Sequence, residues 1–280
     1  MLEHKTIAFL GAGSMAESMI AGVIEAGKMP AERIYATNKS NFERRQELTN
    51  KYGIHTISNE ELPFEKIDMF ILAMKPKGAA EALSAIKNKL KPNQVIISVL
   101  AGISTDFMEE HLQEKQQVVR VMPNTSSMIQ ESATALSAGK YTESENIETV
   151  KELLECMGKV FIIDEEQMDL FTGLAGSGPA YFYYLMENME AVGVQNGMSE
   201  EMVREIIAQT IYGAAKMVMT TKESPTVLRK KVTSPNGTTA AGLQALNTYN
   251  GGDAISQAVF HAAKRSKEIS NELGGKLITK

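Results

Sequence analysis

Two patterns of apolar and polar positions divide this chain near residue 164. Before that point, short apolar runs alternate with amphipathic stretches, and after it only amphipathic stretches of helical period remain. Short buried runs predict strands, and strand–helix alternation predicts a doubly wound α/β sheet. The runs cover residues 6–10, 33–37, 68–74, 94–100, 118–122, 132–138 and 159–163. We therefore predict two domains, an α/β domain at 1–164 and an all-helical domain at 165–280.

The helical half contains one segment that is apolar around most of its circumference. Residues 181–194 place Phe182, Tyr183, Leu185, Met189 and Val192 on several faces of one predicted helix. Such a helix needs burial on all sides. A helical domain of about 115 residues has little interior. We therefore expect a homodimer formed through this region.

A glycine-rich turn follows the first predicted strand. The residues GAGSMA at 11–16 read G-x-G-x-x-A, between a strand and a predicted helix. Gly11 permits the tight turn, Gly13 lets the backbone approach a pyrophosphate, and the small Ala16 lets the helix pack closely on the strand. This context predicts a Rossmann-like dinucleotide-binding domain.

The end of the second predicted strand indicates which dinucleotide is preferred. NAD-specific proteins place a carboxylate there for the ribose 2′-hydroxyl, but residues 33–42 contain none. Asn38, Lys39 and Ser40 occupy this place, and Arg44 and Arg45 follow on the next helix. A cationic, hydroxyl-rich pocket suits a 2′-phosphate, so we expect NADPH to be preferred, with NADH possible. The alternative is that these cations form an ordinary solvated face.

A second candidate site lies late in the chain, at residues 232–247 (VTSPNGTTAAGLQALN). Four turn formers, residues 234–237, precede Thr238 and Thr239 and an apolar helical run. Threonine is a good N-cap, so we expect a helix to begin there. A helix start leaves backbone N–H groups unpaired and binds small anions such as carboxylate. A capped helix after a tight turn, without any ligand, is the alternative.

The loop TSPNGTTAAGLQAL resembles the signature loop of the pyrroline-5-carboxylate reductase family, whose usual text is SPGGTT followed by an apolar helix. Further segments match this family in order: GAGSMA, AMKP at 73–76, RVMPNT at 120–125 and GSGPAY at 176–181. The resemblance therefore covers nearly the whole chain. It implies reduction of L-1-pyrroline-5-carboxylate to L-proline by hydride transfer, the last step of proline biosynthesis. It also implies a homodimer with interlocked helices, with rings of dimers possible.

The resemblance also assigns residues. It places the substrate carboxylate on the amides of the loop, and the Thr239 hydroxyl on the ring nitrogen as the catalytic contact. The substrate-binding candidates are Ser234, Asn236, Gly237, Thr238 and Thr239. The fingerprint, the 2′-phosphate argument and the resemblance together give the cofactor-binding candidates Gly11, Gly13, Ser14, Met15, Asn38, Lys39, Asn59, Ala73, Lys75, Pro76 and Ala101.

This sequence departs from the family text just before and inside the loop. Ser224 replaces His, Arg229 replaces Lys, Lys230 replaces Asp, and Asn236 replaces the first Gly of the loop. Asparagine tolerates left-handed backbone angles, so we expect the turn to survive. The unbroken basic run at 229–231 could change the contacts of the loop with its partners.

Composition limits the remaining classes of function. The net charge of −5 argues against a general nucleic-acid or membrane-surface binder. We expect no signal peptide and no membrane span. We also expect no metal site, since the four histidines are scattered and lack ligand spacing. Cys156, the single cysteine, fits a reducing compartment and a place in the core, so we expect a cytoplasmic protein.

Three alternatives to this reductase remain. One is a reductase of the same plan acting on another imine or a hydroxy acid. The second is a relative that reduces a flavin-like cofactor, which should lack the SPNGTT loop. The third is a nucleotide-binding protein without catalysis, against which the retained Ser234, Gly237, Thr238 and Thr239 argue.

Overall fold

The computed structural model describes residues 2–39 and 41–278, with side chains through residue 273. Residue contacts divide the chain into two compact units, Met1–Gly176 with His261–Lys280, and Ser177–Phe260. The predicted boundary between residues 164 and 165 stays a prediction. The two packing units differ from the predicted domains, because residues 165–176 and the described residues from 261 onward belong to the same unit as the sheet.

An eight-stranded sheet organises the first unit, in the order β3-β2-β1-β4-β5-β6-β7-β8. All neighbours are parallel except β6 and β7. The predicted doubly wound α/β fold is confirmed, and the strand at 132–138 is antiparallel to its neighbour β6. The strands are β1 (Ile7–Leu10), β2 (Ile34–Thr37), β3 (His55–Ile57), β4 (Met69–Leu72), β5 (Val95–Ser98), β6 (Gln117–Met122), β7 (Ser132–Ala138) and β8 (Gly158–Ile162).

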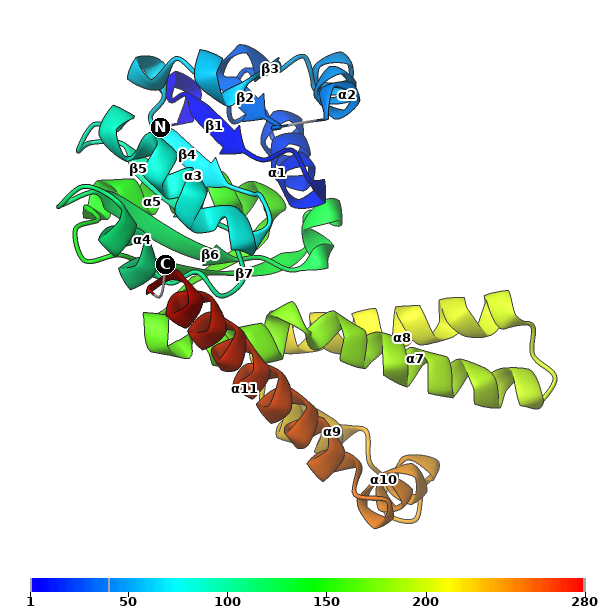
Figure 1. Cartoon of the computed structure of the whole chain (residues 1–280). Helices are drawn as coiled ribbons and strands as arrows, with labels where there is room; N and C mark the ends of the chain where they lie inside the picture. Colours follow the sequence, from blue (N-terminus) through cyan, green and yellow to red (C-terminus); the bar gives the residue numbers. More distant parts are fainter. Residues whose placement is uncertain (1, 40, 279–280) are drawn as a thin grey trace. The chain divides into compact units, whose positions relative to one another are not determined.

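Helices cover both faces of this sheet (Figure 1). Alternate residues of β1 point to opposite faces, so Ile7 and Phe9 join one core cluster and Ala8 and Leu10 the other. The first cluster includes residues of α1 (Ser14–Glu25), α2 (Phe42–Tyr52) and α5 (Ser144–Leu154). The second includes residues of α3 (Ala79–Ile86) and α4 (Thr105–His111). Cys156 is buried beside the first cluster, as expected for core packing.

The strand β3 is the element that the hydrophobic pattern missed. It has only His55, Thr56 and Ile57, none of them buried, so it carries no apolar run. Pairing with β2 at the edge of the sheet holds it in place. The other predicted strands are confirmed. Most are shorter than predicted, because the run of apolar residues extends beyond the residues that are hydrogen-bonded as a strand.

A π-helical turn joins the two halves of the chain. It covers Thr172–Gly176, after α6 (Met168–Phe171) and before α7 (Gly178–Gln195). Pro179 stands in the first turn of α7, where its missing N–H costs nothing. The helical run near Gly176 and Gly178 therefore contains a widened turn.

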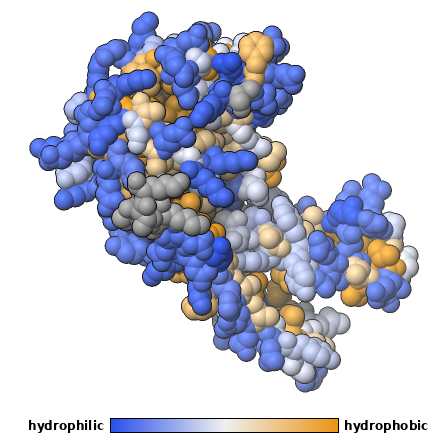
Figure 2. Space-filling model, viewed as in Figure 1, coloured by the Kyte–Doolittle hydropathy of each residue, from blue (hydrophilic) through white to orange (hydrophobic). Residues whose placement is uncertain are grey.

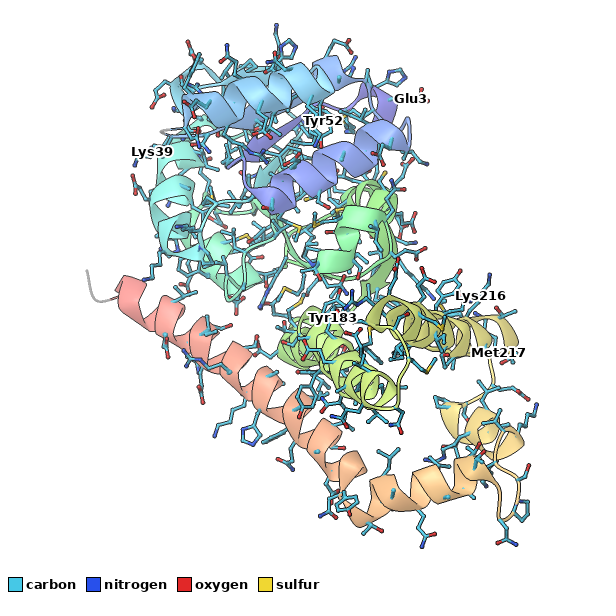
Figure 3. The ribbon with its side chains drawn as sticks, turned by 90° about the vertical axis from the view of Figure 1, so that its right-hand side faces the viewer. Glu3, Lys39, Tyr52, Tyr183, Lys216 and Met217 are labelled. Carbon is cyan, nitrogen blue, oxygen red and sulfur yellow. The ribbon has the colours of Figure 1, made fainter. Side chains whose placement is uncertain are left out.

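The second unit is made only of helices. They are α7, α8 (Glu200–Thr221), α9 (Pro225–Lys231), α10 (Thr238–Thr248) and the beginning of α11 (Gly251–Ile278). Helices α7 and α8 form an antiparallel hairpin, on which Figure 3 labels Tyr183 and Lys216. Gly193 permits their close approach, because a Cβ there would lie 2.6 Å from the Val203 side chain. Arg204 on α8 also pairs with Glu190 on α7 at 2.9 Å.

The hairpin helices leave much of their apolar surface exposed, and apolar residues show at the surface of this hairpin in Figure 2. Phe182 is 52% exposed, Tyr183 56% and Val192 60%, while the few residues of this hairpin that are buried include Val203 and Ile207. The expectation that the helix is apolar on most of its circumference is thus confirmed in this single chain.

The last helix passes two glycines without ending. Glycine often follows the end of a helix, but α11 continues through Gly274 and Gly275 to Ile278. Two glycines weaken a helix without preventing its hydrogen bonding.

Candidate cofactor and substrate sites

The glycine turn lies where the strand order reverses. β1 and β4 are neighbours in the sheet although β2 and β3 separate them in sequence, and ligands of open α/β sheets bind at such a switch point. Gly11 has φ +116°, and a Cβ there would lie 2.6 Å from the Ala73 carbonyl oxygen after β4. Only glycine therefore fits, which brings the first and fourth strand ends together as a nucleotide cradle requires.

A helix start with unpaired amides follows this turn. Gly13 is the N-cap of α1 without a side-chain cap, and the first intrahelical bond at that end runs from Glu17 N to Gly13 O. The amides of Ser14, Met15 and Ala16 thus remain free for an anion such as a pyrophosphate. Ala16 is fully buried, which confirms that this position packs closely.

The cations expected at a 2′-phosphate differ in their availability. Lys39 is 79% exposed in its side chain and pairs at the surface with Glu81 at 2.9 Å, which raises the pKa of its ammonium. Figure 3 shows it beyond the N-terminal end of α2. The Asn38 side chain accepts a hydrogen bond from Asn41 N at 3.0 Å. Ser40 lies outside the described residues.

Arg44 is committed to the protein itself. Its Nε donates to the Ala12 carbonyl at 3.0 Å, one terminal nitrogen pairs with Glu47 at 2.8 Å, and the other pairs with Glu17. All three guanidinium nitrogens are therefore used. Our prediction that Arg44 takes part in a cationic 2′-phosphate pocket is not supported by this geometry. Lys39 and Arg45 remain as cations near the strand end, with the Arg45 guanidinium 5.4 Å from the centre of the Phe42 ring.

Glu17 sits at the centre of this charged cluster on α1 and α2. It also accepts hydrogen bonds from Lys51 at 2.8 Å and the Tyr52 hydroxyl at 3.0 Å. Hydrogen bonds from Lys51 and Arg44 lower the pKa of Glu17 to about 2 from its usual 4.5. The cluster therefore stays ionised and fixes the glycine turn.

The other predicted cofactor contacts lie in loops and short helices of the same unit. Asn59 begins the 3₁₀ helix η3 (Asn59–Glu61), and Lys75 is the N-cap of η5 (Pro76–Gly78), where Pro76 takes the first turn. Ala101 is exposed after β5. Ala73, Lys75 and Pro76 follow β4 at the switch point, while Asn59 follows the edge strand β3.

The loop of the second unit forms a tight turn. Gly237 N donates to Ser234 O at 3.0 Å, and Asn236 has φ +58°. Proline at the second place and a left-handed residue at the third are typical of a type II turn. Asn236 therefore keeps the turn that the family makes with glycine, as expected. A Cβ at Gly237 would lie 3.1 Å from Ser234 O, so this position favours glycine.

Helix α10 begins directly after the turn, but its cap differs from our prediction. The N-cap is Gly237 rather than a threonine, and no side chain caps the helix. The first intrahelical bond there runs from Ala241 N to Gly237 O. The amides of Thr238, Thr239 and Ala240 are therefore unpaired.

Two details of the predicted anion cradle change as a result. The Gly237 amide is already used in the turn, whereas the Ala240 amide, which the sequence did not suggest, is free. The first three helical residues have amides without an intrahelical partner, so Ala240 belongs to this set whether the N-cap is Gly237 or a threonine. Within the described part of the chain, the hydroxyls of Ser234, Thr238 and Thr239 have no hydrogen bond partner, so they remain available to a ligand.

The departures before the loop have ordinary structural roles. Ser224 caps α9 by accepting a hydrogen bond from Val227 N at 3.3 Å. Lys231 pairs with Glu223 at 2.6 Å, across the two ends of that helix. Arg229 and Lys230 in the last turn face no resolved ion partner among the residues described, and they complement the helix dipole.

Among the described residues, no group of three or more His, Cys, Asp or Glu side chains could hold a metal ion. No helix in the described part of the chain is long and apolar enough to cross a membrane.

Models of known protein families match both halves of the chain. Residues 165–269 match the family model described as pyrroline-5-carboxylate reductase dimerisation. Residues 6–102 match the model described as NADP oxidoreductase, coenzyme F420-dependent. The helical half separates this chain from the flavin-like alternative, which shares only the first domain.

Individual relatives agree over almost the full length. Pyrroline-5-carboxylate reductase 1 of Bacillus spizizenii is 56% identical over 98% of this chain and 92% of its own length. The Arabidopsis thaliana pyrroline-5-carboxylate reductase is 37% identical over 96% of both chains.

Solved structures show the same fold. The pyrroline-5-carboxylate reductase of Coxiella burnetii superposes with a TM-score of 0.89 at 30% identity, covering 95% of this chain and 98% of the other. The Plasmodium falciparum pyrroline carboxylate reductase with NADP bound gives 0.86 at 27% identity, covering 96% and 100%. The chain thus belongs to the pyrroline-5-carboxylate reductase family of oxidoreductases.

Proposed function

We propose that this chain reduces L-1-pyrroline-5-carboxylate to L-proline with NADPH, the last step of proline biosynthesis. The observation that carries this proposal is the start of α10, where free amides and free hydroxyls stand together after a tight turn. In a cyclic imine that bears a carboxylate, the carboxylate can bind the amides and the ring nitrogen can contact a hydroxyl.

The substrate carboxylate is assigned to the amides of the loop. Thr238, Thr239 and Ala240 supply N–H donors at the positive end of α10, and Ser234 supplies a hydroxyl. Hydrogen bonds to a charged group contribute about 1.5–3 kcal/mol each. These donors therefore hold the carboxylate without an arginine.

The Thr239 hydroxyl is assigned to the ring nitrogen. A hydride adds to the imine carbon, the π electron pair of the C=N bond moves to nitrogen, and a proton completes the amine. A hydroxyl can orient that nitrogen and relay a proton from water, but it is a weak acid, so water or the protonated imine is the proton source. The net reaction consumes one NADPH and one proton and yields proline and NADP⁺.

The cofactor is assigned to the glycine turn and to the free amides of α1. The residues fit a dinucleotide, because any Cβ at Gly11 would close the cradle against Ala73. When bound, NADPH supplies the hydride. The Ser14 and Met15 amides would hold its pyrophosphate, and residues of the loops after β4 and β5 would contact its nicotinamide half.

Preference for NADPH is assigned to the end of β2. Asn38 and Lys39 stand there, and no carboxylate opposes a 2′-phosphate within 33–42. Because Arg44 is committed to Glu17, Glu47 and Ala12, we expect Lys39 to carry most of the discrimination.

The chain is proposed to form a homodimer with interlocked helices through its dimerisation domain, with larger assemblies of dimers possible. The exposed apolar side chains of α7 and α8 support this, since large exposed apolar patches are typical of protein interfaces.

A single buried cysteine whose pKa is raised by burial suits a reducing compartment, so we assign the protein to the cytoplasm.

The test is NADPH oxidation, followed by its absorbance, with pyrroline-5-carboxylate. Parallel assays use NADH and cyclic imines that lack the carboxylate. The proposal predicts rapid turnover with pyrroline-5-carboxylate and a higher kcat/KM for NADPH. Protein that binds NADPH but turns over only another imine would move the function to that substrate, and the departures at 224–236 would be the first place to examine.

A further inference from the structure

We infer that the first unit contains a binding site for a small zwitterionic amino acid, separate from the glycine turn. The site is a pocket of about 420 Å³ on the face of the sheet that α3 and α4 cover. Its size falls within the range usual for small-molecule sites, about 300–1,000 Å³. It is lined by Ser104, Arg120, Glu165, Asp169, Lys267, Ser270 and Asn271.

Four segments distant in sequence build this pocket. Arg120 comes from β6, Glu165 begins the 3₁₀ helix η9 (Glu165–Gln167), and Asp169 follows on α6. Lys267, Ser270 and Asn271 lie on one face of α11, because residues three and four apart share a face. Ser104 caps α4 and accepts a hydrogen bond from Phe107 N at 3.1 Å.

An ion pair between the buried Arg120 and the half-buried Glu165 lines the pocket, and both members keep unused hydrogen-bonding capacity. Arg120 donates from one terminal nitrogen to Glu165 Oε1 at 2.7 Å, with its side chain only 6% exposed. This is the single hydrogen bond or ion pair that the Arg120 side chain makes with the described residues. Glu165 Oε2 is buried and has no hydrogen bond partner. A buried charged group with unsatisfied atoms is costly, so the pair favours a ligand that supplies the missing partners.

The two missing partners are of opposite kinds. The remaining guanidinium nitrogens of Arg120 can donate to an acceptor, whereas the buried Glu165 Oε2 needs a donor. Lys267, which forms no ion pair with any described residue, adds a second cation above the first. Asp169 adds a second carboxylate, whose Oδ1 accepts a hydrogen bond from Ser266 at 2.7 Å.

This balance of charge selects the class of ligand. A phosphate or sulfate would be repelled by the carboxylates of Glu165 and Asp169. A metal cation would be repelled by Arg120 and Lys267. A molecule that carries a carboxylate and an ammonium a few bonds apart matches both signs. We therefore assign the pocket to a small α-amino acid, with its carboxylate toward Arg120 and Lys267 and its ammonium toward Glu165 and Asp169.

Such a ligand would join α11 to the sheet. Arg120 and Glu165 lie on β6 and η9, while Lys267 and Asn271 lie on α11. Gly102 already packs against this helix, since a Cβ there would lie 3.0 Å from the Leu273 side chain. A ligand bridging the two sides adds a tether, so binding should raise the unfolding temperature.

The test is calorimetric titration of the full-length protein without cofactor. The first probe is L-proline, a choice that rests on the proposed function because proline is the product of that reaction. Glycine is the second probe, and its binding does not depend on the reaction. Pyrrolidine and cyclopentanecarboxylate are matched half-ligands, because each keeps the five-membered ring and only one of the two charges.

Variants separate this site from the substrate loop. Lys267→Met and Glu165→Gln should each weaken zwitterion binding at least about tenfold, the loss of one charged partner. Lys264→Met on the same helix is the matched control, since Lys264 does not line the pocket. Thr239→Ala should leave this binding unchanged. Because Lys267 is exposed, its replacement leaves folding intact, which equal unfolding temperatures would verify.

Each outcome bears directly on the inference. Zwitterion binding that both pocket variants weaken, with half-ligands at least about tenfold weaker, supports it. Binding that Thr239→Ala abolishes and Lys267→Met leaves intact places the amino acid on the substrate loop and overturns it. Absence of binding by both proline and glycine overturns it too, and none of these results depends on turnover of pyrroline-5-carboxylate.

Discussion

The Nε of Arg44 donates a hydrogen bond to the carbonyl oxygen of Ala12 at 3.0 Å, between the two glycines of the nucleotide-binding turn. Arg44 is in turn held by Glu47 on its own helix and by Glu17 on α1. A residue that the sequence offers as a phosphate ligand thus supports the backbone of the cradle. This distinction has measurable consequences for the two cofactors.

Replacing Arg44 and Lys39 should therefore affect the cofactors differently. Arg44→Met loosens the turn that both cofactors share, so the KM values for NADPH and NADH should rise together, about five- to tenfold. Lys39→Ala removes a partner of the 2′-phosphate alone and should raise the NADPH value about tenfold, with little change for NADH. Steady-state kinetics with both cofactors provide the measurement. A selective NADPH defect in the Arg44 variant would refute the assignment of this residue to the turn.

Gly11 should tolerate no side chain. In Gly11→Ala the new Cβ would lie 2.6 Å from Ala73 O, in addition to the strain of φ +116°. We expect NADPH affinity, measured by fluorescence titration, to fall at least about tenfold. Gly27→Ala is the matched control, because Gly27 has φ +62° but nothing within 4 Å of its Cβ. Equal affinities in the two variants would contradict the close approach of β1 and β4.

Glu17 should make stability depend on pH at the acid end. Its pKa is lowered in the folded state, so its stabilisation is fully present above about 4.5 and is lost as the pH falls toward about 2. After allowance for partial exposure, this amounts to about 1–2 kcal/mol at neutral pH. Urea unfolding of the wild type and of Glu17→Gln should show that difference at pH 7 and a smaller one near pH 4. A difference that is constant over this range would argue against ionised Glu17 as the cause.

The exposed apolar face of α7 should form the subunit contact. Phe182→Glu buries a charge in that interface and should weaken self-association at least about tenfold, as sedimentation velocity would show. Asn188→Glu, on the same helix at a residue that is already polar, introduces the same charge and should leave association unchanged. A wild-type chain that is monomeric at micromolar concentration would eliminate the proposed dimer.

The sequence predicted the sheet well because its signals are local. Continuous apolar runs such as 68–74 mark strands that are covered on both faces, and the glycine turn marks the first crossover. β3 escaped because an edge strand of three half-exposed residues needs no apolar run, and pairing with β2 creates it. The π-helical turn at Thr172–Gly176 also has no counterpart in the periodicity of the sequence.

The site was predictable only where the chemistry lies in the backbone. The turn at 234–237 and the helix start after it follow from Pro235, Asn236 and Gly237 in that order. The role of Arg44 could not be predicted, because it depends on Glu17, which lies 27 positions earlier on another helix. The pocket above Arg120 needs four separate segments, and no sequence spacing reveals such an arrangement.

The most direct measurement compares kcat/KM for pyrroline-5-carboxylate in the wild type, Thr239→Ala and Thr239→Ser. If the Thr239 hydroxyl contacts the ring nitrogen, the alanine variant loses about 10–1000-fold, the range that one positioned donor supplies, and the serine variant recovers most of that loss. NADPH affinity should be equal in all three proteins. Wild-type kinetics in the alanine variant would contradict the account and remove Thr239 from the reaction.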